Sequence, residues 1–232
     1  MNSAGPGVVV AVDGTSGSGK SSTSRGVAGR LGLRYLDTGA MYRAVTWWML
    51  RHGVDVEDAE AVARRCLEPR IESGTDPAAP TIAVDGQDVG VEIRSDAVNA
   101  AVSPVSAVPA VRARLQVMQR EAITAAIAAG GIVVEGRDIG SVIWPEAEVK
   151  VYLSADASAR AARRAAEEGG SDVEATRESL LARDQIDSGR AVSPLVLAEG
   201  AVHVDTTDLT LAEAIQTIVD MVERAGDGVS AT

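Results

Sequence analysis

Short runs of apolar residues alternate along the chain with longer segments in which apolar residues recur every three or four positions. The short runs are typical of strands buried on both faces, and the longer spacing predicts amphipathic helices. Strands that alternate with helices predict an α/β fold in three layers, with one five-stranded parallel sheet between two layers of helices. The predicted strands cover residues 8–13, 33–36, 132–135, 149–153 and 201–205.

The helices are marked by their apolar faces and by the residues at their ends. Several begin after an aspartate that can cap the helix, or end at a glycine. The pattern that starts at residue 93 is expected to break at Pro104 and again at Pro109, because proline lacks a backbone N–H. Residues 226–232 are expected to fray. The predicted helices cover residues 21–31, 38–52, 57–67, 93–101, a long segment ending at 129, 157–168, 172–187 and 211–224.

The pattern changes between residues 69 and 91, where three prolines interrupt it. An apolar run at residues 81–84 leads into Asp85-Gly86 and then into residues 87–89. An Asp-Gly pair between two short strands is a strong signal for a tight β-hairpin, since both turn positions need positive φ. We therefore expect a small antiparallel β insertion here.

Composition and charge narrow the classes of function. At 232 residues and 46% hydrophobic content, the chain can bury the core of one domain with an insertion, or of two small lobes. The net charge of −11 argues against sequence-independent binding of nucleic acid, because such binding needs an excess of basic residues. The single cysteine, Cys66, excludes an internal disulfide and is expected to be buried in a helix. No apolar run reaches the roughly 20 residues of a membrane span and no signal-peptide pattern is present, so we expect a cytoplasmic protein with no membrane partner.

The first predicted strand runs directly into a complete G-x-x-x-x-G-K-S motif. Such a loop turns backbone N–H groups toward phosphate oxygens, and the helix after it directs its positive end to the same point. Lys20 can then bridge the β- and γ-phosphates, and the Ser21 hydroxyl can bind Mg²⁺. The strand before the motif argues against a mere Gly/Ser-rich turn. The motif indicates a nucleotide-triphosphate site at Gly14, Thr15, Ser16, Gly17, Ser18, Gly19, Lys20 and Ser21.

Polar clusters follow other predicted strands at the point where each strand ends. They are residues 37–43, 135–138 and 205–207. Because the carboxyl ends of parallel strands meet at one edge of a sheet, we expect these clusters to lie beside the phosphate loop. Each has a simpler interpretation as well: Thr38 can serve only as a helix cap, and Arg43 only as a solvated residue of the first turn.

Arginine supplies nearly all of the positive charge, since Lys20 and Lys150 are the only lysines. Arginine can clamp a phosphate with two parallel hydrogen bonds, although a high-GC genome is the main explanation for the overall preference. Position is therefore more informative than number. For Arg163 and Arg164 a solvent-facing helix surface is an equal alternative. Five arginines lie in or beside the two helices after the fourth strand, where a mobile lid could fold cations over a transferring phosphate: Arg160, Arg163, Arg164, Arg183 and Arg190.

Taken together, these motifs closely resemble those of bacterial cytidylate kinases. The resemblance covers residues 8–223 and is much more specific than the phosphate loop alone. The insertion at residues 69–91 also lies where that family enlarges its monophosphate-binding domain. The motifs that carry the resemblance are residues 14–22, 36–43 (LDTGAMYR), 99–101 (NAA) with Ser103, Pro109 with Val111-Arg112, 135–140 (EGRDIG), Arg183-Asp184 with Asp187, and 190–195 (RAVSPL).

The resemblance implies a P-loop kinase fold and phosphoryl transfer, with Mg²⁺, from ATP to CMP or dCMP, giving CDP or dCDP and ADP. It also implies a monomer whose partners are these small molecules. Three domains are expected: a core of residues 1–37, 130–156 and 191–232, a nucleoside monophosphate-binding domain of residues 38–129, and a helical lid of residues 157–190.

Motif matching to the same family implies roles for individual residues. Residues 14–22, including Ser22, would hold ATP with Arg160 and Arg164, and Ser21 would bind the metal. Thr38 stands where serine is common in the family, and Ser21-Ser22 where Gly-Thr is common; each keeps a hydroxyl. The expected catalytic residues are Lys20, Arg137, Arg183 and Arg190. The expected CMP-binding residues are Ser16, Arg43, Arg137 and Arg190 at the phosphate, Thr38, Ser103, Arg112 and Asp138 at cytosine, and Arg183 with Asp187 at the ribose.

The proposed contacts to cytosine are also chemically sensible. A carboxylate such as Asp138 can accept from the amino group, while Arg112 donates to the ring nitrogen and the carbonyl. Uracil presents a carbonyl in place of the amino group, and a buried polar mismatch of this kind can discriminate strongly. Asp138 can alternatively be a structural residue or one that acts near Mg²⁺.

No general base is expected, because the acceptor phosphate is already an anionic nucleophile. His52 and His203 have no partner pattern and are expected to be structural, while Asp13 can either serve the metal or only fix the turn. A regulatory GTPase is excluded, since the sequence has no Asn-Lys-x-Asp motif. The alternatives left are a small-molecule kinase of another specificity, which does not require the insertion together with Ser103 and Arg112, and a non-catalytic nucleotide sensor.

Overall fold

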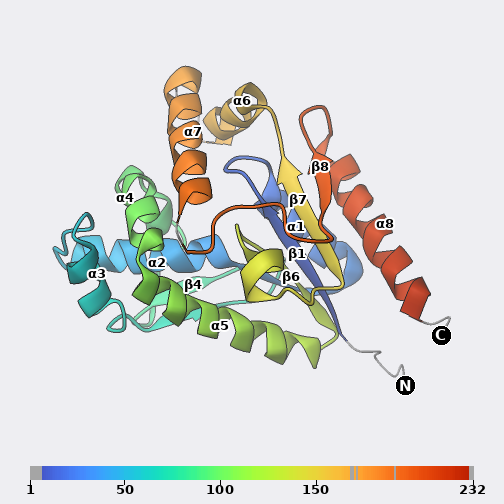
Figure 1. The fold of residues 1–232 in the computed structure, drawn as a ribbon, viewed down its shortest axis with the longest axis horizontal. Helices are drawn as coiled ribbons and strands as arrows, with labels where there is room; N and C mark the ends of the chain where they lie inside the picture. The colour runs from blue at the N-terminus through green and yellow to red at the C-terminus, as the bar shows by residue number, and fades with distance from the viewer. Residues whose placement is uncertain (1–6, 168–169, 171, 191, 230–232) are drawn as a thin grey trace.

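The computed structural model describes residues 7–167, 170, 172–190 and 192–229 (Figure 1). Its central sheet has the strand order β2-β6-β1-β7-β8, and every neighbouring pair is parallel. The predicted five-stranded parallel sheet is therefore confirmed, with strand ends that differ by at most one residue. The strands are β1 (Val8–Gly14), β2 (Arg34–Asp37), β6 (Gly131–Glu135), β7 (Val149–Ser154) and β8 (Val202–Asp205).

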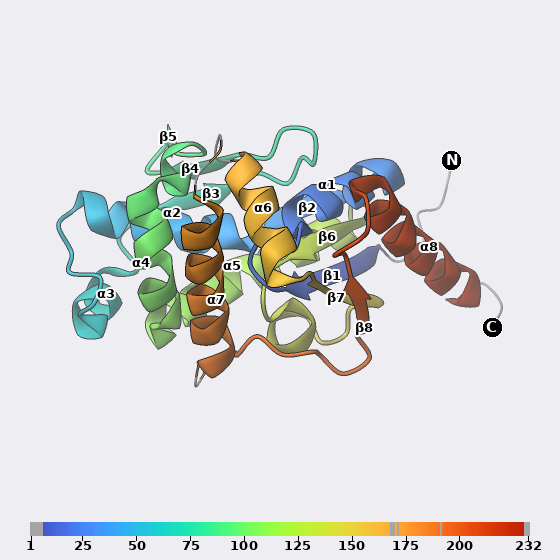
Figure 2. The ribbon, with the colours of Figure 1, turned by 90° about the horizontal axis from the view of Figure 1, so that it is seen from above.

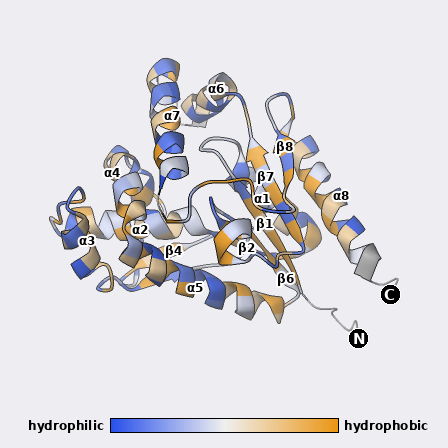
Figure 3. Ribbon diagram, viewed as in Figure 1, coloured by the Kyte–Doolittle hydropathy of each residue, from blue (hydrophilic) through white to orange (hydrophobic). Residues whose placement is uncertain are grey.

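Side chains along β1 alternate between the two faces of the sheet and build two separate cores. Val9 and Ala11 belong to a cluster with α2 (Thr38–Arg51) and α5 (Pro109–Ile127). Val10 and Val12 belong to a cluster with α1 (Lys20–Leu31) and α8 (Leu211–Val229). Figure 3 shows the apolar character of the central strands between these helices. A strand buried on both faces needs a continuous apolar run, so the predicted three layers are confirmed.

A second sheet is antiparallel and lies in the predicted insertion. It consists of β3 (Ile71–Ser73), β4 (Ile82–Val84) and β5 (Gln87–Asp88), and η1 (Glu92–Arg94) follows it. β4 and β5 form the predicted hairpin, and Asp85 and Gly86 at its turn have φ of 52° and 81°. β3 is an addition to the predicted hairpin, because a three-residue strand has no alternation that a sequence pattern can reveal.

The expected helix break at Pro104 is wrong. The helix there, α4 (Asp96–Ala107), continues through Pro104 for three further residues, and the next helix begins at Pro109 as predicted. Proline removes one backbone hydrogen bond, but Val102 and Val105 stay buried in the cluster shared with α2, and this packing holds the last turn. The expected end of the last helix at residue 224 is also wrong, because α8 continues to Val229.

The helix predicted at residues 57–67 is shorter, with α3 covering Ala59–Arg65. Arg114 of α5 donates hydrogen bonds to the carbonyls of Cys66 and Pro69, and so satisfies backbone groups after the helix end. Cys66 is buried as expected, although it lies directly after the helix.

Two helices, α6 (Ala157–Glu167) and α7 (Val173–Gly189), lie beyond the carboxyl ends of the central strands (Figures 1 and 2). The predicted helix end at residue 168 and the tail residues 230–232 lie outside the described residues. A short π-helix, η2 (Ile139–Ile143), follows β6 and has no counterpart in the sequence pattern. Across the part of the chain that the structure describes, no helix is long and apolar enough to cross a membrane.

Candidate active site

The phosphate loop between β1 and α1 depends on glycine at two kinds of position. Gly14 has a φ of 148°, and a Cβ atom there would come within 2.0 Å of the Leu153 carbonyl oxygen in β7. Gly17 has a φ of 76°, and a Cβ there would lie 3.3 Å from side-chain atoms of Arg160 and Leu180. The glycines therefore meet a conformational requirement and also permit close packing under α6 and α7.

Lys20 begins α1 and folds back over the loop, where Nζ donates to the Thr15 carbonyl at 2.5 Å. Burial, with the charge of Arg137 adding to it, lowers the pKa of Lys20 to about 7. A bound phosphate would raise this pKa again, because opposite charge favours the protonated amine. Ser21 lies next to Lys20 in the same pocket, whereas Ser22 lies on the exposed outer side of α1, near Arg25.

A pocket opens at the carboxyl edge of the central sheet. The phosphate loop, α2, α4, α5, α7 and the segment after β6 all contribute to its lining. The polar clusters at residues 37–43 and 135–138 lie there as predicted, and Thr206 of the third cluster donates to the Ser18 carbonyl at 3.1 Å. Five residues of the expected ATP set line the pocket: Ser16, Gly17, Lys20, Ser21 and Arg164. All ten residues of the expected CMP set do so: Ser16, Thr38, Arg43, Ser103, Arg112, Arg137, Asp138, Arg183, Asp187 and Arg190.

The two residues expected to read cytosine bind each other in the lining of the pocket. Arg112 Nη2 donates to Asp138 Oδ2 at 2.5 Å, and the two side chains are 1% and 6% exposed. Arg112 also donates to the Ser106 carbonyl at 3.3 Å and lies over the Tyr42 ring, while its Nε is buried with no hydrogen-bond partner. A buried donor without a partner in a pocket fits a ligand that supplies an acceptor.

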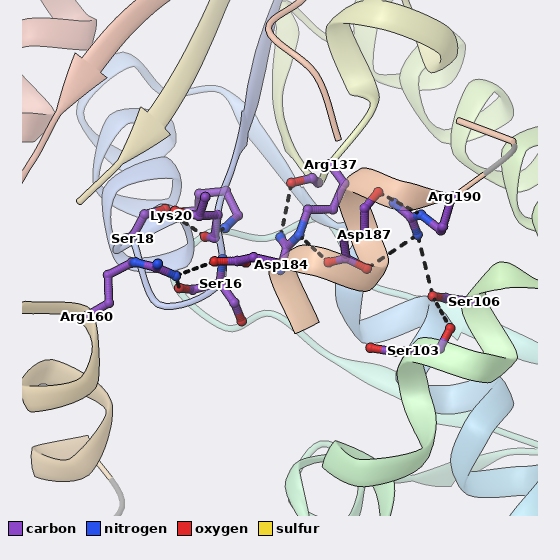
Figure 4. Close-up of polar contacts among 12 residues, drawn as sticks. Ser16, Ser18, Lys20, Ser103, Ser106, Arg137, Arg160, Asp184, Asp187 and Arg190 are labelled. Atoms are coloured by element: carbon purple, nitrogen blue, oxygen red, sulfur yellow. Dashed lines mark hydrogen bonds and ion pairs between the residues drawn. The ribbon is translucent and has the colours of Figure 1, made fainter. Parts of the chain in front are cut away.

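Charged side chains also gather around Asp187, which lies between Arg137 and Arg190, as Figure 4 shows. Arg137 Nε donates to Asp187 Oδ2 at 2.9 Å, and Arg190 lies 3.7 Å from Oδ1. Burial raises the pKa of Asp187, but Arg137 and Arg190 outweigh burial and hold the pKa below its ordinary value. Arg190 Nη2 and Arg183 Nε are both buried with no hydrogen-bond partner.

The pocket lining contains more arginines than carboxylates that could balance their charge. Burial, with Arg183 and Arg164 nearby, lowers the pKa of Arg43 to about 9, and burial together with Arg137 lowers the pKa of Arg183 to about 10. Arg43 donates to Asn99 Oδ1 at 2.6 Å and to the Ile93 carbonyl at 3.2 Å, so its guanidinium is held by α4 and by η1. Cations that raise the free energy of one another favour an anionic ligand between them.

Arg160 and Arg163 lie outside this pocket. Arg160 is buried and donates to the Ser16 carbonyl, to the Ala155 carbonyl and to the Asp184 carboxylate. Arg163 is half-buried and donates to the carbonyls of Thr206 and Thr207 after β8. The solvent-facing alternative for Arg163 is therefore wrong, since its guanidinium holds a loop of the protein.

Glu135 and Ser106 are among the pocket residues to which motif matching assigned no role. Glu135 ends β6, accepts from the Tyr35 hydroxyl at 2.6 Å through Oε1, and leaves Oε2 buried with no partner. Burial, followed by the charge of Asp37, raises the pKa of Glu135 to about 7. Its place at a strand end is the sequence signal that points to it. Ser106 lies one turn after Ser103 in α4, donates to the Ser103 carbonyl at 3.0 Å and lies 3.5 Å from Arg190.

Asp13 fixes the turn after β6. Its two carboxylate oxygens accept from the N–H groups of Ile139 and Gly140, each at 2.8 Å. Burial raises the pKa of Asp13 to about 6. His52 stacks on Trp48, and His203 shares a hydrogen bond with Ser154, so both histidines have structural contacts outside the pocket.

The raised pKa of Asp13 predicts a pH-dependent stability. The folded state holds the carboxyl proton of Asp13 more tightly than the unfolded state does. The contribution of this proton to the free energy of unfolding is therefore fully present below about pH 4 and is lost as the pH rises through about 6. In urea titrations, wild type is expected to lose on the order of 1–3 kcal/mol of unfolding free energy across this window because of Asp13. Asp13→Asn is expected to remove that part of the loss, and the exposed Asp208→Asn is the control. Equal pH slopes for wild type and Asp13→Asn would contradict the assignment.

Comparison with known proteins adds relatives and a structural neighbour. A family model described as cytidylate kinase matches residues 10–224. A cytidylate kinase of Streptomyces griseus is 58% identical over 216 residues, which are 93% of each chain. One from Streptomyces coelicolor is 57% identical over 223 residues, 95% of this chain and 96% of the relative. One from Mycolicibacterium paratuberculosis is 50% identical over 224 residues, 95% and 97% of the two chains.

A gluconokinase structure from Sinorhizobium meliloti superposes with a TM-score of 0.50, over 97% of this chain and 96% of that one. The two sequences are only 16% identical, so this likeness shows the fold alone.

Proposed function

The chain belongs to the cytidylate kinase family and phosphorylates CMP with ATP, and we propose that dCMP is a second acceptor and that donor and acceptor meet at the phosphate loop. This proposal depends on one observation: Lys20 and the ten residues of the expected acceptor set all line the same pocket.

The donor side is built on the phosphate loop. N–H groups of residues 14–22 and the positive end of α1 would hold the ATP phosphates, and Lys20 would neutralise the charge that moves between β- and γ-oxygens. Arg164 lines the pocket beside the loop and would add a second cation, while Arg160 would act on ATP from behind the loop, through Ser16.

The residues present fit a Mg²⁺ ion that is held mainly by the nucleotide. Among the described residues, no group of three or more His, Cys, Asp or Glu side chains could hold a metal. Ser21 lies in the pocket, and the buried Glu135 Oε2 has no partner, so Ser21 would bind the ion directly and Glu135 through water. When bound, Mg²⁺ neutralises charge on the phosphate oxygens.

The acceptor side would recognise the base, the ribose and the phosphate separately. Asp138 and Arg112 would bind the cytosine edge, with Thr38 and Ser103 beside them, and Arg183 and Asp187 would reach the ribose. Ser16, Arg43, Arg137 and Arg190 would hold the phosphate.

Catalysis in this arrangement consists of alignment and charge stabilisation. The acceptor phosphate attacks as an anion, so the residues must overcome repulsion between two polyanions and fix them in line. Arg137, Arg183 and Arg190 provide the positive charge between them. The pair α6–α7, as a lid of residues 157–190 closing on the core and the monophosphate-binding domain, would exclude the water that could hydrolyse ATP. The enzyme would act as a cytoplasmic monomer.

An acceptor panel tests the substrate assignment. With ATP and Mg²⁺, kcat/KM measured by coupled detection of ADP is expected to be highest for CMP and dCMP, about tenfold or more lower for UMP, and near background for AMP and dTMP. Preference for AMP or dTMP would contradict the assignment, and nucleotide binding without ADP release would favour a sensor.

A further inference from the structure

A closed ring of three interactions joins the phosphate loop to α6 and α7. The Ser16 N–H donates to Asp184 Oδ1 at 2.8 Å, and the Ser16 carbonyl accepts from Arg160 Nη1 at 2.8 Å. The same Arg160 Nη1 lies 2.5 Å from Asp184 Oδ2. Figure 4 shows Arg160 and Asp184 on either side of Ser16. Both polar backbone groups of one loop residue are thus held by side chains from two different helices.

The ring is buried and anchored. The Arg160 and Asp184 side chains are 6% and 14% exposed. Arg160 Nε also donates to the Ala155 carbonyl at 3.0 Å, which fixes the arginine to the segment that follows β7. Gly17 packs directly under Arg160 and Leu180, so the loop and the two helices are in close contact at this point.

Asp184 contacts the phosphate loop, whereas its neighbours on α7 line the pocket. Arg183 and Asp187 line the pocket, whereas Asp184 and Arg160 do not. Asp184 is hydrogen-bonded directly to Ser16, the loop residue that does line the pocket. Because Gly17 comes next and glycine allows a wide range of φ, the peptide at Ser16 needs an external contact to keep one orientation.

We propose that Asp184 is a positioning residue that sets the Ser16 hydroxyl toward the acceptor phosphate when α7 is docked on the loop. This inference rests on the proposed function, in which the Ser16 hydroxyl contacts the acceptor phosphate while backbone N–H groups of the loop hold ATP. Arg160 neutralises the carboxylate, so that Asp184 can sit beside a triphosphate site without repelling the donor. When α6 and α7 dock on the phosphate loop, the same contacts therefore complete the acceptor site.

The test is a double-mutant cycle between Asp184 and Ser16. Asp184→Ala is expected to lower kcat/KM for CMP by about 10- to 50-fold, mainly through a higher KM for CMP, because the Ser16 hydroxyl loses its direction. Binding of a non-hydrolysable ATP analogue, measured by calorimetry without CMP, is expected to change by less than about threefold, since N–H groups after Ser16 bind the donor. Ser16→Ala should give a loss of similar size, and Asp184→Ala with Ser16→Ala should lose little more than either alone.

Two further variants separate positioning from folding. Asp184→Asn keeps an oxygen for the Ser16 N–H and is expected to recover most of the activity, and melting temperatures show whether each variant is folded. Glu178→Ala removes an exposed carboxylate of the same helix and should behave as wild type. Additive losses in the cycle, equal losses in ATP and CMP binding, or an Asp184→Ala enzyme with wild-type kinetics would overturn the proposal. Failure of wild type to phosphorylate CMP would overturn the proposed function instead.

Discussion

A Lys20→Ala enzyme is expected to fold normally and to phosphorylate CMP about 10³-fold more slowly than wild type. Lys20 is the only lysine that lines the pocket, and its amine lies 2.5 Å from the Thr15 carbonyl at the base of the phosphate loop. Without ligand, burial and Arg137 lower its pKa to about 7, so the protein around it does not balance its charge. Phosphates would provide that balance. Loss of one preorganised donor to a charge that develops in the transition state costs about 10²–10³ in kcat, and a transferring phosphoryl group is strongly charged.

The chain offers a matched control, because Lys150 is the only other lysine. Its Nζ donates to the Glu199 carbonyl at 3.0 Å, outside the pocket. Lys150→Ala should keep wild-type kcat and KM for both substrates. The measurement is steady-state ADP release at saturating ATP and CMP, with melting temperatures for both variants. A Lys20→Ala enzyme that retains kcat within tenfold of wild type would refute the assigned donor site.

Replacement of Asp138 is expected to have the second-largest effect, on the choice of base. Asp138→Ala should lower kcat/KM for CMP by roughly 10²–10³ and that for UMP much less, because the carboxylate accepts from an amino group that uracil lacks. The advantage of CMP over UMP should therefore narrow.

Part of this loss would be structural, so a second variant is needed. Asp138→Ala leaves the buried Arg112 guanidinium without its partner, and breaking a buried pair in this way costs about 3–5 kcal/mol of stability. Asp138→Asn keeps an oxygen for Arg112 but adds an amide donor that faces the cytosine amino group. It is expected to stay folded and still lose most CMP activity. Asp205→Ala, at the end of β8 and outside the pocket, is the control. If Asp138→Asn kept the wild-type ratio of CMP to UMP, Asp138 would be structural.

Local patterns were sufficient for most elements, whereas the family resemblance supplied the individual residues expected in the pocket. The phosphate loop, the five strands and the hairpin at Asp85-Gly86 each depend on neighbours within a few residues, and all are present. The strand-end clusters could be placed together because parallel strands end at one edge of a sheet. The prediction for Pro104 failed for the opposite reason, since packing against α2 outweighed a local rule.

The sequence by itself determined that a triphosphate-binding loop follows the first strand of a parallel sheet. Its motifs also identified the chain as similar to a family of kinases that act on CMP. Periodicity, glycine conformation and motif spacing are properties of residues close together in the sequence, so they can be recognised without knowledge of the fold. Only the tertiary structure decided that Arg112 and Asp138, 26 positions apart, form a buried pair, and that Asp184, 168 positions from Ser16, holds the backbone of the loop. Such contacts depend on how helices pack over the sheet, and no local pattern carries that information.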